Sequence, residues 1–174
     1  MEYSFCPRCG GPLASKLLKP TEPERLVCTV CGFVFFLDPK VAAGTLFTIE
    51  GKIPLLQRSI EPSYGKWVFP GGFVDRGEAV RDAAVRETRE EAHLEVRLVS
   101  LLNVYSYSGS PVILVVYAAE VIGGELEAGD ECLDVRLFAP EDIPWQDLAF
   151  PSTREAVGEY VDKFLSGGRS SGEE

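Results

Sequence analysis

The stretch from Gly72 to Leu94 constrains the fold of this 174-residue chain more than any other. From Glu78 to Ala92 it consists of strong helix formers without an internal Gly or Pro, and glycines precede it, which predicts a loop that enters a helix. One face of this helix begins with small apolar residues and ends in three carboxylates, in the order Val80, Ala83, Ala84, Glu87, Glu90 and Glu91. The small residues suit packing on a sheet, and the carboxylates continue the same face.

Two of these carboxylates, Glu87 and Glu91, lie one helical turn apart. Like charges at this spacing destabilise a helix by about 0.2 to 0.5 kcal/mol unless something compensates them. A hard divalent cation such as Mg²⁺ or Mn²⁺ would do so, because it prefers carboxylate oxygens. Arg86 could hold a carboxylate in one rotamer through charge-assisted hydrogen bonds. The alternative is a solvated surface helix laced with charges, and the helix by itself leaves both interpretations open.

The same stretch resembles the Nudix box, G-x5-E-x7-R-E-U-x-E-E-x-G-U, in which U is aliphatic. The residues at the matching positions are Gly72, Glu78, Arg86, Glu87, Glu90, Glu91 and Leu94. Two positions depart from the pattern: Thr88 stands where an aliphatic residue is usual, and His93 stands where Gly usually ends the helix. The resemblance implies a hydrolase with an α+β fold, in which a mixed β-sheet is sandwiched between helices.

In the Nudix family, glutamates of the box bind divalent metal together with a backbone carbonyl that precedes it. A carboxylate from a later loop often joins them, as a ligand or as the catalytic base. Carried over, the implied ligands of Mg²⁺ or Mn²⁺ are Glu87, Glu90, Glu91, Glu131 and the carbonyl of Gly71. Glu87 is the first candidate for the base, and Arg86 would orient the carboxylates. For Glu131 the alternative is one solvated acid among several in the loop ELEAGDE.

Two C-x2-C pairs near the N-terminus, Cys6 with Cys9 and Cys28 with Cys31, have the spacing of a zinc ribbon. Four thiolates would close a tetrahedral structural zinc site, and an iron centre or a pair of disulfides are the alternatives. We therefore expect a zinc ribbon at residues 1–38, a hydrolase domain at residues 39–166 and a disordered tail at residues 167–174. Cys132 stands outside this scheme; it is expected to be a small, buried or partly buried residue, and the alternative is a nucleophile.

The composition fits one substantial core with a small appendage, since 45% of the residues are hydrophobic and 25% are charged. A formal net charge of −10 disfavours binding to nucleic acid, because such binding depends on Lys and Arg contacts with phosphate. No apolar run approaches the roughly 20 residues of a membrane-spanning helix, and the first residues lack a signal-peptide pattern. A cytoplasmic protein without a membrane or nucleic-acid partner is expected.

The rest of the hydrolase domain alternates between strands and turns. Strands are expected at residues 41–49, 53–58, 67–69, 94–107, 112–121 and 133–138. The first two would form a hairpin that turns at Glu50–Gly51–Lys52. The segment 112–121 is almost wholly apolar and is therefore expected in the centre of its sheet. A final helix is expected to begin with Ser152 as its N-cap and to run to about residue 165.

A zinc ribbon ahead of a Nudix domain resembles two groups, the NADH pyrophosphatases and the plant-type pyrophosphatases that act on FAD and ADP-ribose. The NADH group carries the array SQPWPFPxS downstream of the box, where this chain reads NVYSYSGSP. The segments IEPSYGKW and VRLFAPEDIPWQDLAF look more like the plant-type group. The resemblance implies cleavage of an ADP-X diphosphate, ADP-ribose or FAD, to AMP and a second phosphate ester.

Substrate contacts follow from the chemistry of such a nucleotide. Aromatic candidates for stacking on the base are Phe47, Phe73, Tyr105 and Tyr107, and cationic candidates for the phosphates are Arg58 and Lys66. The alternatives are cleavage of NADH or NAD-capped RNA, or a non-catalytic protein that senses a nucleotide and docks on a partner. Because family members are often homodimers, a homodimer is a further possibility.

Overall fold

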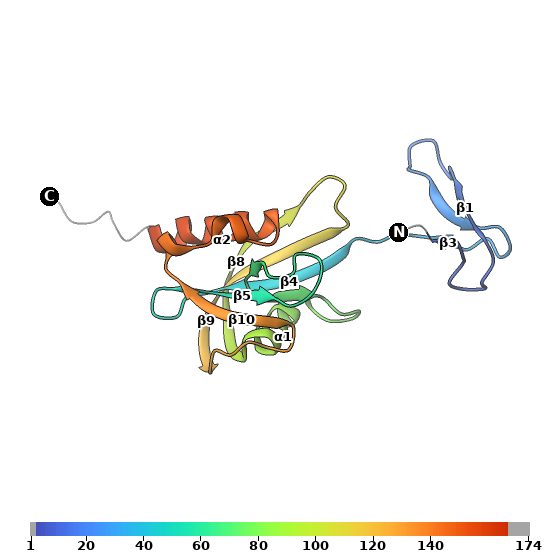
Figure 1. Cartoon of the computed structure of the whole chain (residues 1–174). Helices are drawn as coiled ribbons and strands as arrows, with labels where there is room; N and C mark the ends of the chain where they lie inside the picture. The colour runs from blue at the N-terminus through green and yellow to red at the C-terminus, as the bar shows by residue number, and fades with distance from the viewer. Residues whose placement is uncertain (1–2, 167–174) are drawn as a thin grey trace. The chain divides into compact units, whose positions relative to one another are not determined.

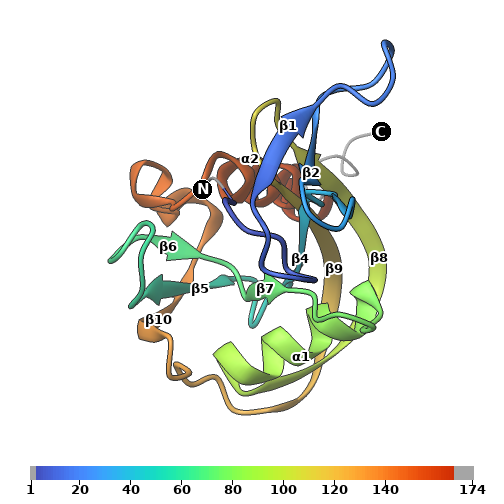
Figure 2. The same ribbon diagram turned by 90° about the vertical axis from the view of Figure 1, so that its right-hand side faces the viewer.

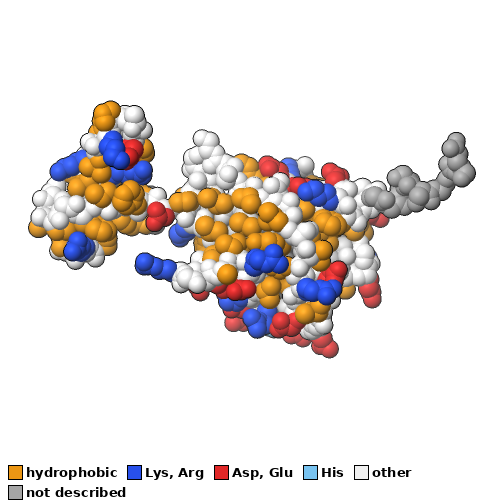
Figure 3. Space-filling model, turned by 180° about the vertical axis from the view of Figure 1, so that it is seen from behind, with side chains coloured by type: hydrophobic (Ala, Val, Ile, Leu, Met, Phe, Trp, Pro, Cys, Tyr) orange, Lys and Arg blue, Asp and Glu red, His pale blue; other side chains and the backbone are white. Residues whose placement is uncertain are grey.

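The computed structural model describes residues 3–166 and divides the chain into two compact units, Met1–Pro39 and Lys40–Glu174 (Figure 1). The tail expected to be disordered, residues 167–174, lies outside the described residues. The N-terminal unit is a three-stranded antiparallel sheet of β1 (Leu13–Lys16), β2 (Arg25–Cys28) and β3 (Val34–Phe35). Figure 3 shows many apolar side chains on the surface of this unit, and the exposed ones include Phe5, Leu17, Val30 and Phe36. So small a unit has little interior in which to bury them.

The C-terminal unit contains two sheets. The four-stranded sheet has the order β7 (Gly71–Phe73), β4 (Lys40–Leu46), β9 (Val112–Gly124) and β8 (Leu94–Ser106). Strands β4 and β9 run parallel and the other pairs run antiparallel, so the sheet is mixed. The three-stranded antiparallel sheet has the order β10 (Cys132–Phe138), β5 (Ile53–Arg58) and β6 (Trp67–Val68). Strand β9 lies between β4 and β8, which confirms the prediction of a central apolar strand.

Two longer helices, α1 (Val80–Ala92) and α2 (Pro151–Tyr160), lie on opposite sides of the strands (Figures 1 and 2). Short helices η1 (Pro140–Asp142) and η2 (Trp145–Asp147) precede α2, and a π-helical segment η3 (Val161–Leu165) extends it. Beneath α2 lies a core that includes Leu55, Trp67, Val116 and Val157. The expected α+β architecture, helices around a mixed sheet, is confirmed. None of the helices in residues 3–166 has the length and apolarity that crossing a membrane requires.

The predicted hairpin between residues 41–49 and 53–58 is wrong. The two segments meet only at the isolated bridge between Ile49 and Lys52, and β4 and β5 belong to different sheets. Both edges of β4 are already paired, one with β7 and one with β9, so no edge remains for β5. Strand β5 instead crosses to the second sheet, where its first four residues are buried.

Both long helices begin differently from the prediction. Helix α1 starts at Val80, and Glu78 lies in the turn that precedes the helix, where its carboxylate accepts the amide of Asp75. Helix α2 starts at Pro151 with Phe150 as N-cap, not with Ser152, since proline suits the first helical position. At its other end α1 terminates in a left-handed residue, His93, with φ 54°. The conformation that glycine usually supplies is therefore adopted here by histidine.

Candidate active site

Helix α1 packs its small residues on the sheet and thereby sets the position of its carboxylates. Ala83 and Ala84 are fully buried against a cluster that includes Ala43 and Tyr117. Thr88 is also fully buried, and its hydroxyl donates to the carbonyl of Ala84 at 2.7 Å. A second buried hydroxyl, that of Thr45 on β4, lies 2.6 Å from the Thr88 oxygen. The polar residue at the usually aliphatic position therefore has a matching partner across the helix–sheet contact.

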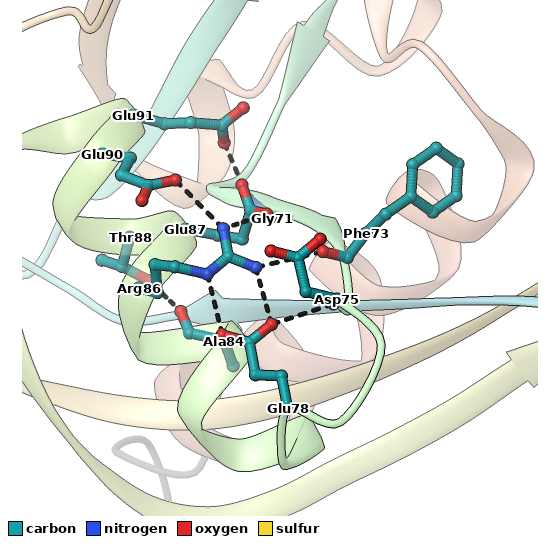
Figure 4. Close-up of polar contacts among 10 residues, drawn as sticks. All are labelled: Gly71, Phe73, Asp75, Glu78, Ala84, Arg86, Glu87, Thr88, Glu90 and Glu91. Atoms are coloured by element: carbon teal, nitrogen blue, oxygen red, sulfur yellow. Dashed lines mark hydrogen bonds and ion pairs between the residues drawn. The ribbon is translucent and has the colours of Figure 1, made fainter.

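Arg86 organises the acidic face of α1 (Figure 4). Its Nε and Nη2 atoms bond the Glu78 carboxylate at 2.8 and 2.9 Å, and Nη1 reaches Glu87 at 2.8 Å and Glu90 at 3.0 Å. Nη2 also donates to the carbonyl of Phe73 at 3.1 Å. These five contacts use all five N–H donors of the guanidinium. Arg86 thus holds the carboxylates in place and has no donor left over for a substrate.

The surroundings shift the pKa values of the carboxylates in this network in opposite directions. Hydrogen bonds from Arg86 and from the Asp75 amide hold the pKa of Glu78 at about 2. Its carboxylate partners raise the pKa of the Arg86 guanidinium, with Glu78 the largest contributor. Burial, by contrast, raises the pKa of Glu87 despite its contact with Arg86. Glu78 is therefore a fixed anion that anchors Arg86, whereas Glu87 is a stronger proton acceptor than an ordinary carboxylate.

Glu91 is the most buried of the three box carboxylates. It accepts the backbone N–H of Gly71 at 2.8 Å. Burial is the main cause that raises its pKa to about 7; the negative charges of Glu87 and Glu131 add to the shift, and the Gly71 N–H opposes it. The backbone of β7 approaches closely enough that a side chain at Gly72 would overlap the Glu87 carboxylate. Glycine at this position therefore leaves room for the Glu87 carboxylate, which a larger residue would displace.

A cavity of about 990 Å³ lies over this face of the helix. Its acidic lining consists of Glu61, Asp75, Glu87, Glu90, Glu91, Asp130 and Glu131. The two cations in the lining are Arg58 and Arg86. The structure thus brings Glu131, from the loop before β10, to the same cavity as the carboxylates of α1.

The other sequence-predicted residues divide into those that line the cavity and those that do not. Arg58, Phe73, Tyr105 and Tyr107 line it. Arg58 lies 5.2 Å from the ring of Phe150 and donates to the carbonyl of Pro62 at 3.0 Å. Tyr105 is almost fully buried, and its hydroxyl donates to Glu159 at 2.7 Å, so little of its surface is available to a substrate.

Two substrate candidates lie elsewhere. Phe47 is fully buried in a cluster with Leu56, Ala92 and Leu94, so its assignment as a stacking residue is corrected: it is a core residue. Lys66 forms an ion pair with Asp147 at 2.7 Å and is absent from the cavity lining. Sequence reasoning also missed Phe150, which lines the cavity beside Arg58. No local pattern could have revealed it, because the two residues are far apart in the chain.

The donor set of the cavity fits a hard divalent cation. Four carboxylates, those of Glu87, Glu90, Glu91 and Glu131, face one space, and burial, with a smaller contribution from the neighbouring carboxylates, raises the pKa values of Glu87 and Glu91. Their oxygens are more widely spaced than the ligands of a closed site. Among residues 3–166, only the cysteines form a group of three or more whose ligand atoms all lie within 4.8 Å of one another.

Those four cysteines, Cys6, Cys9, Cys28 and Cys31, come together in the N-terminal unit. The sulfur of Cys6 lies 3.8 Å from that of Cys31, and the sulfur of Cys9 lies 3.5 Å from that of Cys28. In a tetrahedral site with Zn–S bonds of about 2.3 Å, the sulfurs lie roughly 3.8 Å apart, close to the two separations found here. Amides of Cys31 and Val30 donate to the Cys28 sulfur, each at 3.4 Å, and lower the pKa of its thiol to about 6. The cluster therefore fits a structural zinc site.

Comparison with known proteins decides the family. The profile described as NUDIX domain matches residues 38–159. The chain belongs to the Nudix hydrolase family. A second profile, described as Nudix N-terminal and named for its zinc ribbon, matches residues 4–36 of this Nudix hydrolase. The expected combination of a zinc ribbon with a Nudix domain is confirmed.

Relatives of this Nudix hydrolase include an ADP-ribose pyrophosphatase and NAD-capped RNA hydrolases. An ADP-ribose pyrophosphatase of Methanocaldococcus jannaschii is 40% identical over 145 residues, which cover 81% of this chain and 80% of that protein. An NAD-capped RNA hydrolase NudC of Pseudomonas fluorescens is 26% identical over 95% of this chain, which spans only 57% of that longer protein.

Solved structures agree with the fold. The crystal structure of a NUDIX hydrolase from Nitrosomonas europaea superposes with a TM-score of 0.87 at 32% identity, covering 93% of this chain and 92% of that one. An ADP-ribose pyrophosphatase of Streptococcus suis superposes with a TM-score of 0.62 at 27% identity, covering 78% and 96% of the two chains.

Proposed function

We propose that this Nudix hydrolase cleaves the diphosphate bond of an ADP-X nucleotide, ADP-ribose or FAD, and releases AMP. The observation that carries the proposal is the convergence of Glu87, Glu90, Glu91 and Glu131 on one cavity large enough for a nucleotide. The relative named ADP-ribose pyrophosphatase, at 40% identity, supports the choice of substrate class. FAD shares the ADP half of ADP-ribose and is the second substrate to test.

The proposed metal ligands are the four cavity carboxylates and the carbonyl of Gly71, and the proposed ion is Mg²⁺ or Mn²⁺. Such an ion, when bound, stabilises charge on the diphosphate and lowers the pKa of an attacking water. Arg86 orients Glu87 and Glu90 through the contacts described above. Because Arg86 is fully engaged, Arg58 is the lining cation that remains for a phosphate oxygen.

The proton of the attacking water has two candidate acceptors. Glu87 is favoured because burial raises its pKa while Arg86 fixes its rotamer, which suits a general base. Glu131 lines the same cavity from another element and is the alternative. For the base of the nucleotide, Phe73 is the favoured stacking residue, since this residue is 51% exposed and lines the cavity, and Tyr107 is the second.

The proposal is tested with a panel of FAD, ADP-ribose, NADH, NAD⁺ and diadenosine polyphosphates, each with Mg²⁺ or with Mn²⁺. Products are identified by chromatography. AMP release from ADP-ribose or FAD that requires metal supports the proposal and names the substrate. Absence of turnover on every compound contradicts it and favours a nucleotide-sensing role.

A second candidate function is cleavage of NADH or NAD-capped RNA. It is favoured by the NudC relatives, whose similarity extends over 95% of this chain, ribbon included. Two observations oppose it: the downstream array of the NADH group is absent, and the net charge of −10 disfavours an RNA backbone. Preference for NADH within the same panel would reverse the order of the two proposals.

We further propose that the hydrolase domain spans residues 39–166, that the protein acts in the cytosol, and that it forms a homodimer. Free cysteines arranged for zinc suit a reducing compartment.

The dimer is supported by Val99, Leu101 and Val104, which are exposed on β8, the last strand in the order of its sheet. Light scattering coupled to gel filtration gives the mass in solution, and a monomer at micromolar concentration contradicts the dimer.

A further inference from the structure

The carboxylate of Glu131 belongs to a loop, yet the backbone around it is tightly held. Residues Gly129 to Cys132 form a β-turn, in which the amide of Cys132 donates to the carbonyl of Gly129 at 3.0 Å. Asp130 and Glu131 occupy the two central positions and are exposed, whereas Gly129 is buried. Gly129, at the corner of the turn, therefore faces the protein, whereas Asp130 and Glu131, at its tip, face the cavity.

The buried corner docks on the C-terminal end of α1. The last carbonyls of a helix have no partner within it and need donors from elsewhere. Here the amide of Gly129 donates to the carbonyl of Glu91 at 2.9 Å, and the amide of Glu127 donates to that of Ala92 at 3.3 Å. The loop that carries Glu131 thus caps the helix that carries the other carboxylates.

Only glycine allows so close an approach at the corner. A Cβ at Gly129 would overlap the carbonyl oxygen of Glu90 and lie 2.9 Å from the Cα of Glu91. Both neighbours are helix backbone, which cannot move aside as a flexible side chain could. The φ of Gly129 lies outside the left-handed region, so the requirement is for space and not for an unusual conformation.

The other side of the turn is fixed as well. The carbonyl of Glu131 accepts the amide of Ser59, just after β5, at 2.9 Å. The backbone of Glu131 is therefore held between the end of α1 and the end of β5. Its side chain lines the cavity, and its charge contributes to the raised pKa values of Glu87 and Glu91.

We infer that Gly129 is a positioning residue, which holds Glu131 at the reacting centre by docking the turn directly on the backbone of α1. The inference rests on the proposed function, in which Glu131 serves the reaction as a ligand or as the base. It adds that the loop is pre-set before substrate binds, so that the distance between Glu131 and the carboxylates of α1 is a fixed property of the fold.

The test compares Gly129→Ala, Glu131→Gln and the double variant in turnover of ADP-ribose or whichever panel substrate is best. Gly158→Ala is the matched control, since a Cβ at Gly158 in α2 meets nothing within 4 Å. Misplacement of a reacting group by about 1 Å can cost roughly 100-fold, so Gly129→Ala should lower kcat by about tenfold or more with little change in KM. The control should keep wild-type turnover.

The double variant separates positioning from a general structural effect. If Gly129 acts through Glu131, adding Gly129→Ala to Glu131→Gln should cost almost nothing further. Multiplied losses would overturn the inference, because they would show that Gly129 acts through α1 instead. Wild-type turnover in Gly129→Ala, with a slow Glu131→Gln, would overturn the inference and leave the role of Glu131 intact. Wild-type turnover in Glu131→Gln would remove Glu131 from the proposed reaction altogether.

A second variant keeps the inference testable if Gly129→Ala fails to fold. Glu131→Asp preserves the charge, shortens the side chain by one methylene and changes an exposed position. Because the backbone of the turn is fixed on α1, it cannot move toward the reacting centre to compensate for the shorter side chain. Turnover should therefore fall nearly as far as in Glu131→Gln. Turnover close to that of the wild type would show that the loop adjusts freely, and would contradict a pre-set distance.

Discussion

Replacing Glu91 by Gln should stabilise the metal-free protein above neutral pH while impairing catalysis. Glu91 is partly buried beside two other carboxylates, and its pKa is raised to about 7 from an ordinary value of 4.5. The difference, at about 1.4 kcal/mol for each pH unit, corresponds to about 3 kcal/mol of folding free energy. Gln is uncharged and nearly isosteric, and its carbonyl oxygen can still accept the Gly71 N–H.

The pH dependence follows from the direction of the shift. Because the pKa of Glu91 is higher in the folded state, folding favours the protonated acid. The destabilisation from ionised Glu91 is therefore absent below about pH 4.5, grows between pH 4.5 and 7, and is complete above pH 7. Glu91→Gln should match the wild type near pH 4.5 and exceed its stability by about 3 kcal/mol at pH 8.

Urea unfolding followed by tryptophan fluorescence measures this difference. Both tryptophans, Trp67 and Trp145, lie in the C-terminal unit, so their fluorescence reports on the unfolding of that unit and not of the zinc ribbon. Samples are dialysed free of Mg²⁺ and Mn²⁺ without a strong chelator, which leaves zinc in place. Glu141→Gln, at an exposed carboxylate of η1, is the control and should change stability by less than about 0.5 kcal/mol. A folded Glu91→Gln protein without a gain at pH 8, or with an equal gain at pH 4.5, would refute the reasoning.

Four further predictions follow from the sites described. Glu87→Gln should lower turnover by at least about 100-fold in the substrate panel without loss of bound zinc, and unchanged turnover would remove Glu87 from the mechanism. Thr88→Val should cost about 1 to 3 kcal/mol in urea unfolding, because the buried Thr45 hydroxyl loses its partner, and the double variant with Thr45→Val should recover part of that loss. The contribution of Glu78, whose pKa is held at about 2, should persist from neutral pH and disappear only as pH falls below 4.5 towards 2; an acid titration in which Glu78→Gln and the wild type unfold together would contradict it. Cys28→Ser should reduce the zinc content, measured by atomic emission, from about one ion per chain to a small fraction.

The local features of the chain were predictable from its sequence, with errors at element ends. The helix with three carboxylates on one face required only a periodicity of 3.6 and the absence of Gly and Pro, and it forms at Val80–Ala92. The four cysteines were found by spacing alone, because each C-x2-C pair is itself a local structure. The starts of α1 and α2 were misplaced by a residue or two, since side-chain contacts and Pro151 decide them.

Features that depend on distant partners were not predictable. The prediction of a hairpin at residues 41–58 was wrong because β7 and β9 pair with the two edges of β4. The residues of the two predicted strands do not indicate that other strands compete for these edges. Phe47 and Phe73 look alike as aromatic residues, yet one is fully buried and the other is 51% exposed beside the cavity. Burial depends on which elements pack together, and this is a property of the whole fold.

The sequence by itself therefore determined the chemistry of this Nudix hydrolase: four thiolates for zinc, and box carboxylates with an arginine among them. Residue type and short-range spacing carry that information, because ligand preference and helical periodicity are local. The tertiary structure alone decided how those groups are used. It commits every donor of Arg86, buries Glu91 enough to raise its pKa, and docks Gly129 on α1. Each of these depends on long-range contacts that exist only after the chain has folded.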